Sequence, residues 1–176
     1  MPTPPSHSAD SLPSDWVRRW ADQIPKGGRV LDVACGAGRH ARYLAARGFA
    51  VDAVDIDIST CAGCTASPSI SLRQADLEGE PWPYPAEIFQ GIVVTNYLHR
   101  PLFPSLLGSL APGGVLIYET FALGNERYGR PKNPNFLLLP DELLEMVRGK
   151  LRVIAYEDVL AEVPRLARVQ RICAIG

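Results

Sequence analysis

Residues 29–48 read RVLDVACGAGRHARYLAARG, and this stretch decides the fold. Its first part, 30–33, is the short apolar run of a buried parallel strand. A glycine-rich turn follows at 35–38, and apolar side chains then recur at helical spacing until Gly48, a residue that often ends helices. A strand, a glycine-rich turn and a helix in this order let backbone N–H groups approach a ligand closely. The pattern predicts a cofactor-binding turn.

Two classes of cofactor fit this turn. Gly36-x-Gly38-x-x-Ala41 matches the dinucleotide fingerprint, and Asp55 lies 19 residues past Gly36, close to the place of the ribose-binding acid. Asp32 argues against a dinucleotide, because a carboxylate beside the turn would repel a pyrophosphate. The same carboxylate would stabilise a ligand that carries an ammonium group.

The stretch DVACGAGRHA, residues 32–41, resembles motif I of the class I methyltransferases that use S-adenosylmethionine (SAM). SAM has an ammonium group and a ribose but no phosphate, which agrees with an acid at position 32. The resemblance implies that Asp32 supports the cofactor ammonium. It also implies that the cofactor lies against the turn residues Ala34, Cys35, Gly36 and Gly38.

The second predicted strand covers residues 49–55 and ends in an acid. Ligands of open parallel sheets lie beyond the carboxyl ends of the strands, so Asp55 is placed to accept hydrogen bonds from a ribose diol. Ile56 follows it and is a further candidate for cofactor contact. Asp57 is expected to cap a following helix.

The third predicted strand, 70–75, ends at Asp76 and Leu77. The resemblance implies that Asp76 reaches the adenine amino group and that Leu77 offers its backbone N–H to the ring. Residues 80–94 resemble the family's passage into the fourth strand and depart from it at Gln90, where an acid is usual.

The fourth predicted strand, 92–95, ends where the methyl acceptor would have to lie. Asn96 is expected at the cofactor, and Tyr97, His99 and Arg100 are candidates for substrate contact. Tyr97 and His99 are also the catalytic candidates, since a histidine pKa normally lies near neutrality and suits a general base. A packing role for His99 stays open. The sequence is not N-P-P-Y or N-P-P-F, the signature of amino-directed DNA methylation.

Composition favours one domain. The chain has 176 residues, 47% hydrophobic content and a net charge of −1, which suits a single globular unit over 14–176. Residues 1–13, rich in Pro and Ser, are predicted to be a disordered tail, and Ser14 to cap a helix over 15–23. No apolar run is long enough for a membrane span and no signal-peptide core is present, which favours the cytoplasm. Dispersed basic residues make a nucleic-acid partner unlikely, and nothing sets the oligomeric state.

Four cysteines are present, at positions 35, 61, 64 and 173, and they do not form the pattern of a disulfide framework. Cys61 and Cys64 have the spacing of a metal or redox motif. No second Cys/His pair completes a zinc site, so no metal is expected, and both residues are assigned to packing.

The second half of the chain completes a Rossmann-like α/β fold. Pro104 can start a helix, and an L-x-P-G-G-x-L pattern precedes the fifth strand. The resemblance implies the class I methyltransferase sheet, which is mostly parallel and seven-stranded, with a reversed last strand and helices on both faces. The remaining predicted elements are a helix over 104–110, a strand over 115–120, a helix over 140–149 and a hairpin over 151–158 and 165–175.

Residues 122–139 form a long predicted loop, which we expect to act as a lid over the acceptor site. Gly and Pro residues disfavour regular structure there, while Tyr128 and the apolar run at 136–139 are unusual for a free linker. Arg130, with Arg127 and Lys132, would either face an anionic acceptor or lie in solvent.

These features predict a methyltransferase that transfers the methyl group of SAM to a small-molecule acceptor. S-adenosylhomocysteine (SAH) would be the product. Two alternatives stay open: a nicotinamide-dependent oxidoreductase, and a protein that binds SAM without catalysis. The second half of the chain, with YETFALGNE at 118–126, also has a looser likeness to small bacterial methyltransferases of the tellurite-resistance type.

Overall fold

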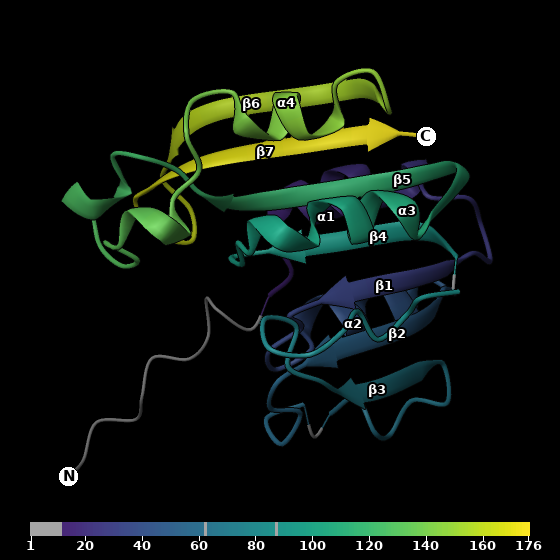
Figure 1. Ribbon diagram of the computed structural model, residues 1–176. Helices are drawn as coiled ribbons and strands as arrows, with labels where there is room; N and C mark the ends of the chain where they lie inside the picture. The colour runs from purple at the N-terminus through teal and green to yellow at the C-terminus, as the bar shows by residue number, and fades with distance from the viewer. Residues whose placement is uncertain (1–11, 62, 87) are drawn as a thin grey trace, which may run out of the picture.

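The computed structural model describes residues 12–61, 63–86 and 88–176. Seven strands form one sheet in the order β3-β2-β1-β4-β5-β7-β6, shown in Figure 1. The pairs on the β3 side of β5 are parallel, and β7 is antiparallel to both β5 and β6. The predicted mostly parallel sheet with a reversed last strand is therefore confirmed. The strands are β1 Arg29–Val33, β2 Ala50–Asp55, β3 Ile70–Gln74, β4 Phe89–Thr95, β5 Leu110–Phe121, β6 Arg152–Ala161 and β7 Ala167–Ile175.

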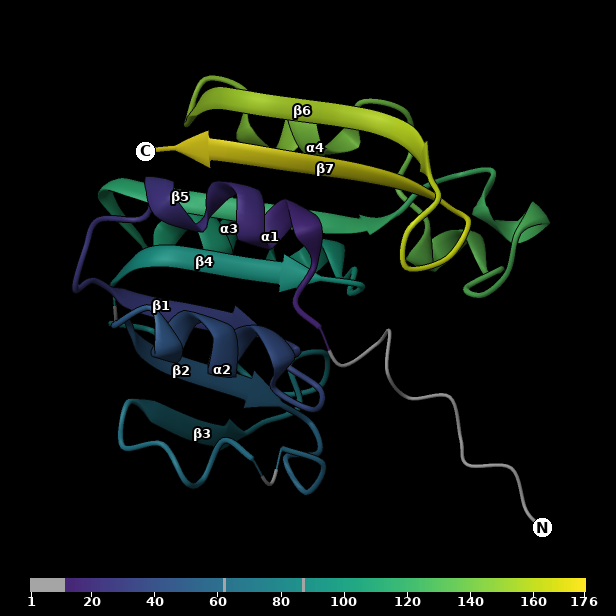
Figure 2. The ribbon, with the colours of Figure 1, turned by 180° about the vertical axis from the view of Figure 1, so that it is seen from behind.

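Helices cover both faces of the sheet. Helices α1 and α2 lie over one face, as Figure 2 shows, and α3 and α4 lie over the other face. Their bounds are α1 Asp15–Trp20, α2 Arg39–Ala46, α3 Phe103–Gly108 and α4 Glu142–Val147. Short 3-10 turns occur at Ala21–Gln23, Arg100–Leu102, Asn125–Arg127 and Pro134–Phe136.

The strand β1 contributes side chains to the cores on both faces of the sheet. Leu31 and Val33 pack in the core under α3 and α4, while Val30 packs in the core under α1 and α2. Because side chains alternate along a strand, Asp32 lies on the same face as Val30, toward α2. An acid is tolerated inside this buried strand because the start of a helix lies against it.

Several element boundaries differ from the predictions. Ser14 does cap α1, since its hydroxyl accepts a hydrogen bond from the Trp16 amide, but the helix changes to a 3-10 turn after Trp20. The fifth strand begins at Leu110, five residues early, because Leu110 pairs with Phe89 across an irregularity in the ladder. No helix forms in the described part of 57–69; instead the Asp57 carboxylate caps a turn by accepting from the Ser59 amide.

The predicted tail, 1–13, lies mostly outside the described residues. At its end, the Leu12 carbonyl accepts a hydrogen bond from Arg39 at 3.2 Å, so Leu12 is held beside the start of α2. Within the described chain, no helix is both long enough and apolar enough to span a bilayer.

Candidate active site

The glycine-rich turn lies at the carboxyl end of β1. Gly36 and Gly38 have positive φ angles of 53° and 71°, and Ala34 shares this left-handed conformation at 52°. Glycine adopts such angles without steric cost, whereas alanine is strained by them. A Cβ built on Gly36 would meet no atom within 4 Å. The turn therefore presents open space above Gly36.

Asp55 ties the ends of β1 and β2 together. Its Oδ2 accepts a hydrogen bond of 2.8 Å from the Gly36 amide, and its Oδ1 accepts one of 3.1 Å from Asp57. The neighbouring Ile56 is 62% exposed, which is unusual for a large apolar side chain. A carboxylate and an exposed apolar side chain at this edge fit the ribose and the adenine ring of a nucleoside.

Asp32 lies beneath the turn rather than at its surface. It is 1% exposed, and its Oδ2 accepts a hydrogen bond of 2.9 Å from the Ala41 amide in α2. Burial raises its pKa to about 7, although the Ala41 amide and the Arg39 guanidinium both favour the charged form. A positive charge bound nearby would stabilise the carboxylate further.

Asp76 and Leu77 lie at the end of β3. The Asp76 Oδ1 accepts hydrogen bonds from the Glu78 and Gly79 amides at 2.9 and 3.0 Å, which caps the following turn. Leu77 is 7% exposed and packs in the core under α3 and α4. Both predicted cofactor residues therefore lie on the same sheet edge as Asp55.

Tyr97 and His99 are brought together with Glu78. His99 Nδ1 lies 3.9 Å from the Glu78 carboxylate. The Tyr97 hydroxyl is buried and makes no hydrogen bond of normal geometry within the described residues, while burial and the nearby Glu78 charge raise its pKa well above the usual range. These two side chains are thus on the Asp76 side of the site.

Asn96 and Arg100 occupy different surroundings. Asn96 has a positive φ of 55° and is exposed at the end of β4, where its backbone N–H donates to the Glu119 backbone carbonyl. Arg100 forms a two-pronged ion pair with Glu142 at 2.5 and 2.8 Å, and it also donates to the Asn135 and Leu137 carbonyls. Its guanidinium therefore holds the 122–139 segment to α4.

The predicted lid, 122–139, is more ordered than a plain loop. Its ends are joined by a bridge between Ala122 and Leu138, and Asn125 is buried with its side chain bonded to the Pro131 carbonyl. In Figure 1 the segment projects beyond the carboxyl end of β5. Its cationic side chains, Arg127, Arg130 and Lys132, are exposed.

A cavity of about 540 Å³ lies beside Asn96. Its wall includes Ser14 and Arg18 from the start of the chain, Arg39 from α2, and Arg165 from the turn between β6 and β7. Phe121 and Val169 contribute apolar surface. Tyr97, His99, Arg100 and Arg130 are not part of its lining.

Sequence reasoning did not find the network that joins this cavity to α2. The Ser14 amide donates to His40 Nε2 at 3.1 Å, and the Ser14 hydroxyl donates to the Glu119 carboxylate at 2.7 Å. His40 Nδ1 faces the Thr95 hydroxyl at 3.3 Å. Burial, with a smaller effect of Arg39, lowers the His40 pKa to about 3, so this imidazole is neutral. Only the helix cap at Ser14 was visible in the sequence.

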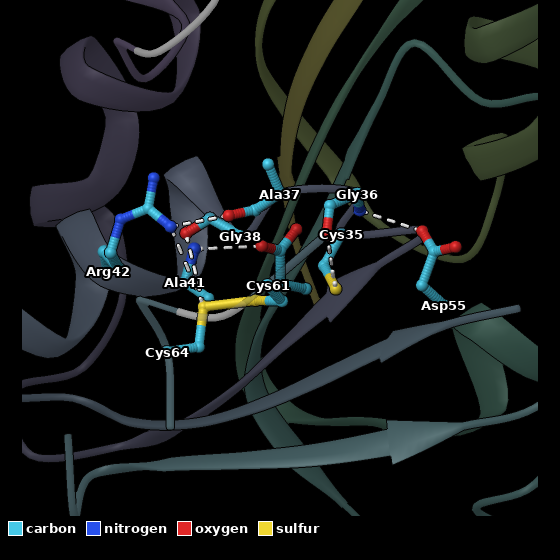
Figure 3. Close-up of a disulfide and its surroundings, with 10 residues drawn as sticks. Cys35, Gly36, Ala37, Gly38, Ala41, Arg42, Asp55, Cys61 and Cys64 are labelled. Atoms are coloured by element: carbon cyan, nitrogen blue, oxygen red, sulfur yellow. Dashed lines mark hydrogen bonds between the residues drawn. A yellow bond between two sulfur atoms is a disulfide. The ribbon is translucent and has the colours of Figure 1, made fainter. Parts of the chain in front are cut away.

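The structure corrects the prediction for two cysteines. Cys61 and Cys64 form a disulfide, and both are buried beside Gly38, as Figure 3 shows. The prediction failed because a pairing three residues apart depends on the conformation of the loop between β2 and β3. Cys35 and Cys173 are free and buried. Within the described ranges, no three His, Cys, Asp or Glu side chains cluster as metal ligands.

The strand order and the reversed β7 define the sheet of the class I methyltransferases. A family model described as a methyltransferase domain matches residues 6–148, so the chain belongs to that family. The resemblance found in the sequence is confirmed, and SAM is the cofactor of this class.

Curated relatives match part of the chain. The ribosomal protein L11 methyltransferase of Bordetella parapertussis is 36% identical over 117 residues, which cover 64% of this chain and 36% of the relative. The trans-aconitate 2-methyltransferase of Methylobacterium nodulans is 34% identical over 99 residues, covering 52% and 37%. The match thus spans little more than a third of either relative.

Among solved structures, TehB from Haemophilus influenzae has a TM-score of 0.75 and 19% identity. The alignment covers 94% of this chain and 62% of TehB. At this identity the likeness shows a shared fold.

Proposed function

We propose that the chain binds SAM at the carboxyl ends of β1, β2 and β3 and transfers its methyl group to a small-molecule acceptor. The single observation that carries this proposal is the open space above Gly36, beside the Asp55 carboxylate. A ribose placed there would donate its hydroxyl groups to Asp55, and the exposed side chain of Ile56 would cover one face of the adenine.

Asp32 supports the ammonium end of the cofactor in this proposal. Its carboxylate is buried and accepts a hydrogen bond from the Ala41 amide, and burial disfavours its charge. A cofactor ammonium close to the turn would restore the favourable charge balance, whereas a pyrophosphate would worsen it. This charge argument favours SAM over a nicotinamide dinucleotide.

The acceptor is proposed to enter the cavity beside Asn96. Its volume of about 540 Å³ suits a small molecule, and several arginines contribute to its wall. One relative is named for trans-aconitate and another for a ribosomal protein, so both acceptor classes occur among relatives. The wall also carries the carboxylates of Asp15, Glu119 and Glu162, so its charge does not select an anionic acceptor. The limited volume favours a small molecule over a protein.

The protein's own contribution would be alignment and exclusion of water. SAM supplies a methyl group on a sulfonium that is already activated for displacement. The chain needs to hold the acceptor atom in line and to keep solvent out, and such positioning accounts for a large share of rate acceleration. Catalytic roles for Tyr97 and His99 stay predictions, as does substrate contact by Arg100 and Arg130. The cytoplasm is the compartment that we propose.

Calorimetric titration with SAM, SAH and NAD tests the cofactor. We expect SAM and SAH to bind and NAD not to bind; tight NAD binding without SAM binding would overturn the proposal. Incubation with SAM and a panel of carboxylic acids, amines and thiols then tests catalysis, with SAH release as the readout. Binding without release of SAH for any acceptor would favour a non-catalytic SAM-binding protein.

A further inference from the structure

The disulfide between Cys61 and Cys64 lies directly against the cofactor turn. A Cβ built on Gly38 would overlap both sulfur atoms, so the sulfurs fill the space that this glycine leaves free. The Cys64 Sγ lies 3.8 Å from the Gly38 carbonyl oxygen. Gly38 precedes the first residue of α2 and has a φ of 71°. The disulfide and the turn are thus in direct contact.

Arg42 joins the same two parts of the molecule. Its Nη1 donates a hydrogen bond of 2.5 Å to the Ala37 carbonyl of the turn and lies 3.9 Å from the Cys64 Sγ, as Figure 3 shows. A guanidinium beside a cysteine stabilises the thiolate form. If Cys64 became a thiolate, it would attract the Arg42 guanidinium, which now donates to the Ala37 carbonyl.

The loop that carries the disulfide connects two predicted cofactor positions. It starts after Asp55 and Ile56 and returns to β3, which leads to Asp76. The described part of 57–69 has neither helix nor strand and is held by turns, such as the bond from the Cys64 amide to the Cys61 carbonyl. Such a loop can move without unfolding the sheet.

We propose that Cys61–Cys64 is a reversible thiol–disulfide switch that controls the affinity of the glycine-rich turn for its cofactor. The oxidised pair supports Gly38 in the binding conformation. Two separate thiols need more room than a bonded pair, so reduction displaces the turn or the loop and weakens binding. The cofactor part of this inference rests on the proposed function.

The chemistry is exchange with an external thiol. A thiolate attacks the Cys61 sulfur, the S–S bond breaks, and Cys64 leaves as a thiolate beside Arg42. A second external thiolate then attacks the mixed disulfide, releasing the oxidised external pair and the Cys61 thiolate. Two external thiols are oxidised for each protein disulfide reduced. Because both cysteines are buried, the exchange requires local opening of 57–69.

The test compares oxidised and dithiothreitol-reduced full-length protein. Titration of the denatured oxidised chain should find two reactive thiols, Cys35 and Cys173, and four after reduction. Reduction should weaken SAH binding by about tenfold, within the usual range of coupling between sites. Hydrogen exchange of the 36–42 amides, measured without ligand, should become faster.

Two variants complete the test. The double variant Cys61→Ser/Cys64→Ser should bind SAH like the reduced wild type and should not respond to reductant. Cys173→Ala, which keeps the disulfide, should respond like the wild type. Four thiols in the oxidised chain, or equal exchange at 36–42 in both states, would overturn the switch. Equal SAH affinity in the oxidised and reduced forms would also overturn it. If exchange changes but neither form binds SAH, the disulfide does control the turn and the proposed cofactor is wrong.

Discussion

The Gly36 amide donates a hydrogen bond of 2.8 Å to the Asp55 carboxylate, which joins the ends of two neighbouring parallel strands at the centre of the candidate site. This bond orients Asp55 toward the open space above the turn. It also makes the backbone of the turn depend on a side chain from β2.

Asp55→Ala should lose both functions of this carboxylate. Loss of charge-assisted hydrogen bonds to a ribose should cost about 1.5–3 kcal/mol, which is roughly ten- to hundredfold in SAH affinity. Calorimetry measures the change. Asp57→Ala is the matched control, because this neighbouring carboxylate is exposed and caps the turn at Ser59. Equal affinity for the Asp55 variant and the wild type would reject the ribose assignment.

Ala34→Gly should stabilise the protein. Ala34 is held at a φ of 52°, where an L side chain is strained by about 1–2 kcal/mol. Glycine removes this strain and loses some chain entropy, so a net gain of up to about 1 kcal/mol is expected in denaturant unfolding. Ala37→Gly is the control in the same turn, because Ala37 does not share the positive φ and should lose stability. A loss of stability in both variants would contradict the strain argument.

His40 and Asp32 should make opposite contributions to the pH dependence of stability. Below pH 6.5 the unfolded chain protonates His40, while the folded chain does so only near pH 3, so this contribution rises with pH between these values. The folded chain keeps Asp32 protonated up to about pH 7, against an ordinary value of 3.8, so its contribution falls as pH rises through that interval. Between pH 3.8 and 6.5 the two slopes oppose each other.

Two variants separate these contributions. The free energy of unfolding of His40→Gln should lack a rise with pH of up to about 1.4 kcal/mol per pH unit that the wild type has. That of Asp32→Asn should lack a fall with pH of similar size. Denaturant unfolding from pH 4 to 6.5 measures both differences. Parallel curves for all three proteins would show that neither side chain titrates as its burial implies.

Arg100→Lys should loosen the 122–139 segment, and it also tests whether Arg100 contacts the acceptor. Lysine keeps the charge but cannot make the two-pronged pair with Glu142 or reach both carbonyls, so a loss of about 1 kcal/mol in stability is expected. Hydrogen exchange at 125–139 should become faster. If the variant instead raises the KM of an acceptor with unchanged exchange, Arg100 contacts substrate, as the sequence suggested. Hydrogen exchange of this segment with and without SAH and acceptor also tests the predicted lid.

The fold could be predicted well because its signals are local. Alternating side chains indicate the strand β1, and the glycines at 36 and 38 indicate the turn after it. The acid at 55 marks the end of the next strand. Element ends were predicted less well, since the early start of β5 depends on pairing with Phe89, which is distant in sequence.

The sequence by itself determined the order of the strands, because periodicity and turn residues act over a few positions. Its resemblance to motif I indicated the family, and the edge of the sheet where a cofactor would bind stays a prediction. Tertiary structure alone decided which distant groups meet. It brings the Ser14 amide within hydrogen-bonding distance of His40 and the Arg100 guanidinium to the Glu142 carboxylate. It also packs the Cys61 and Cys64 sulfurs against Gly38. These contacts depend on how whole elements pack and on which side chains become buried there, and no local pattern encodes that.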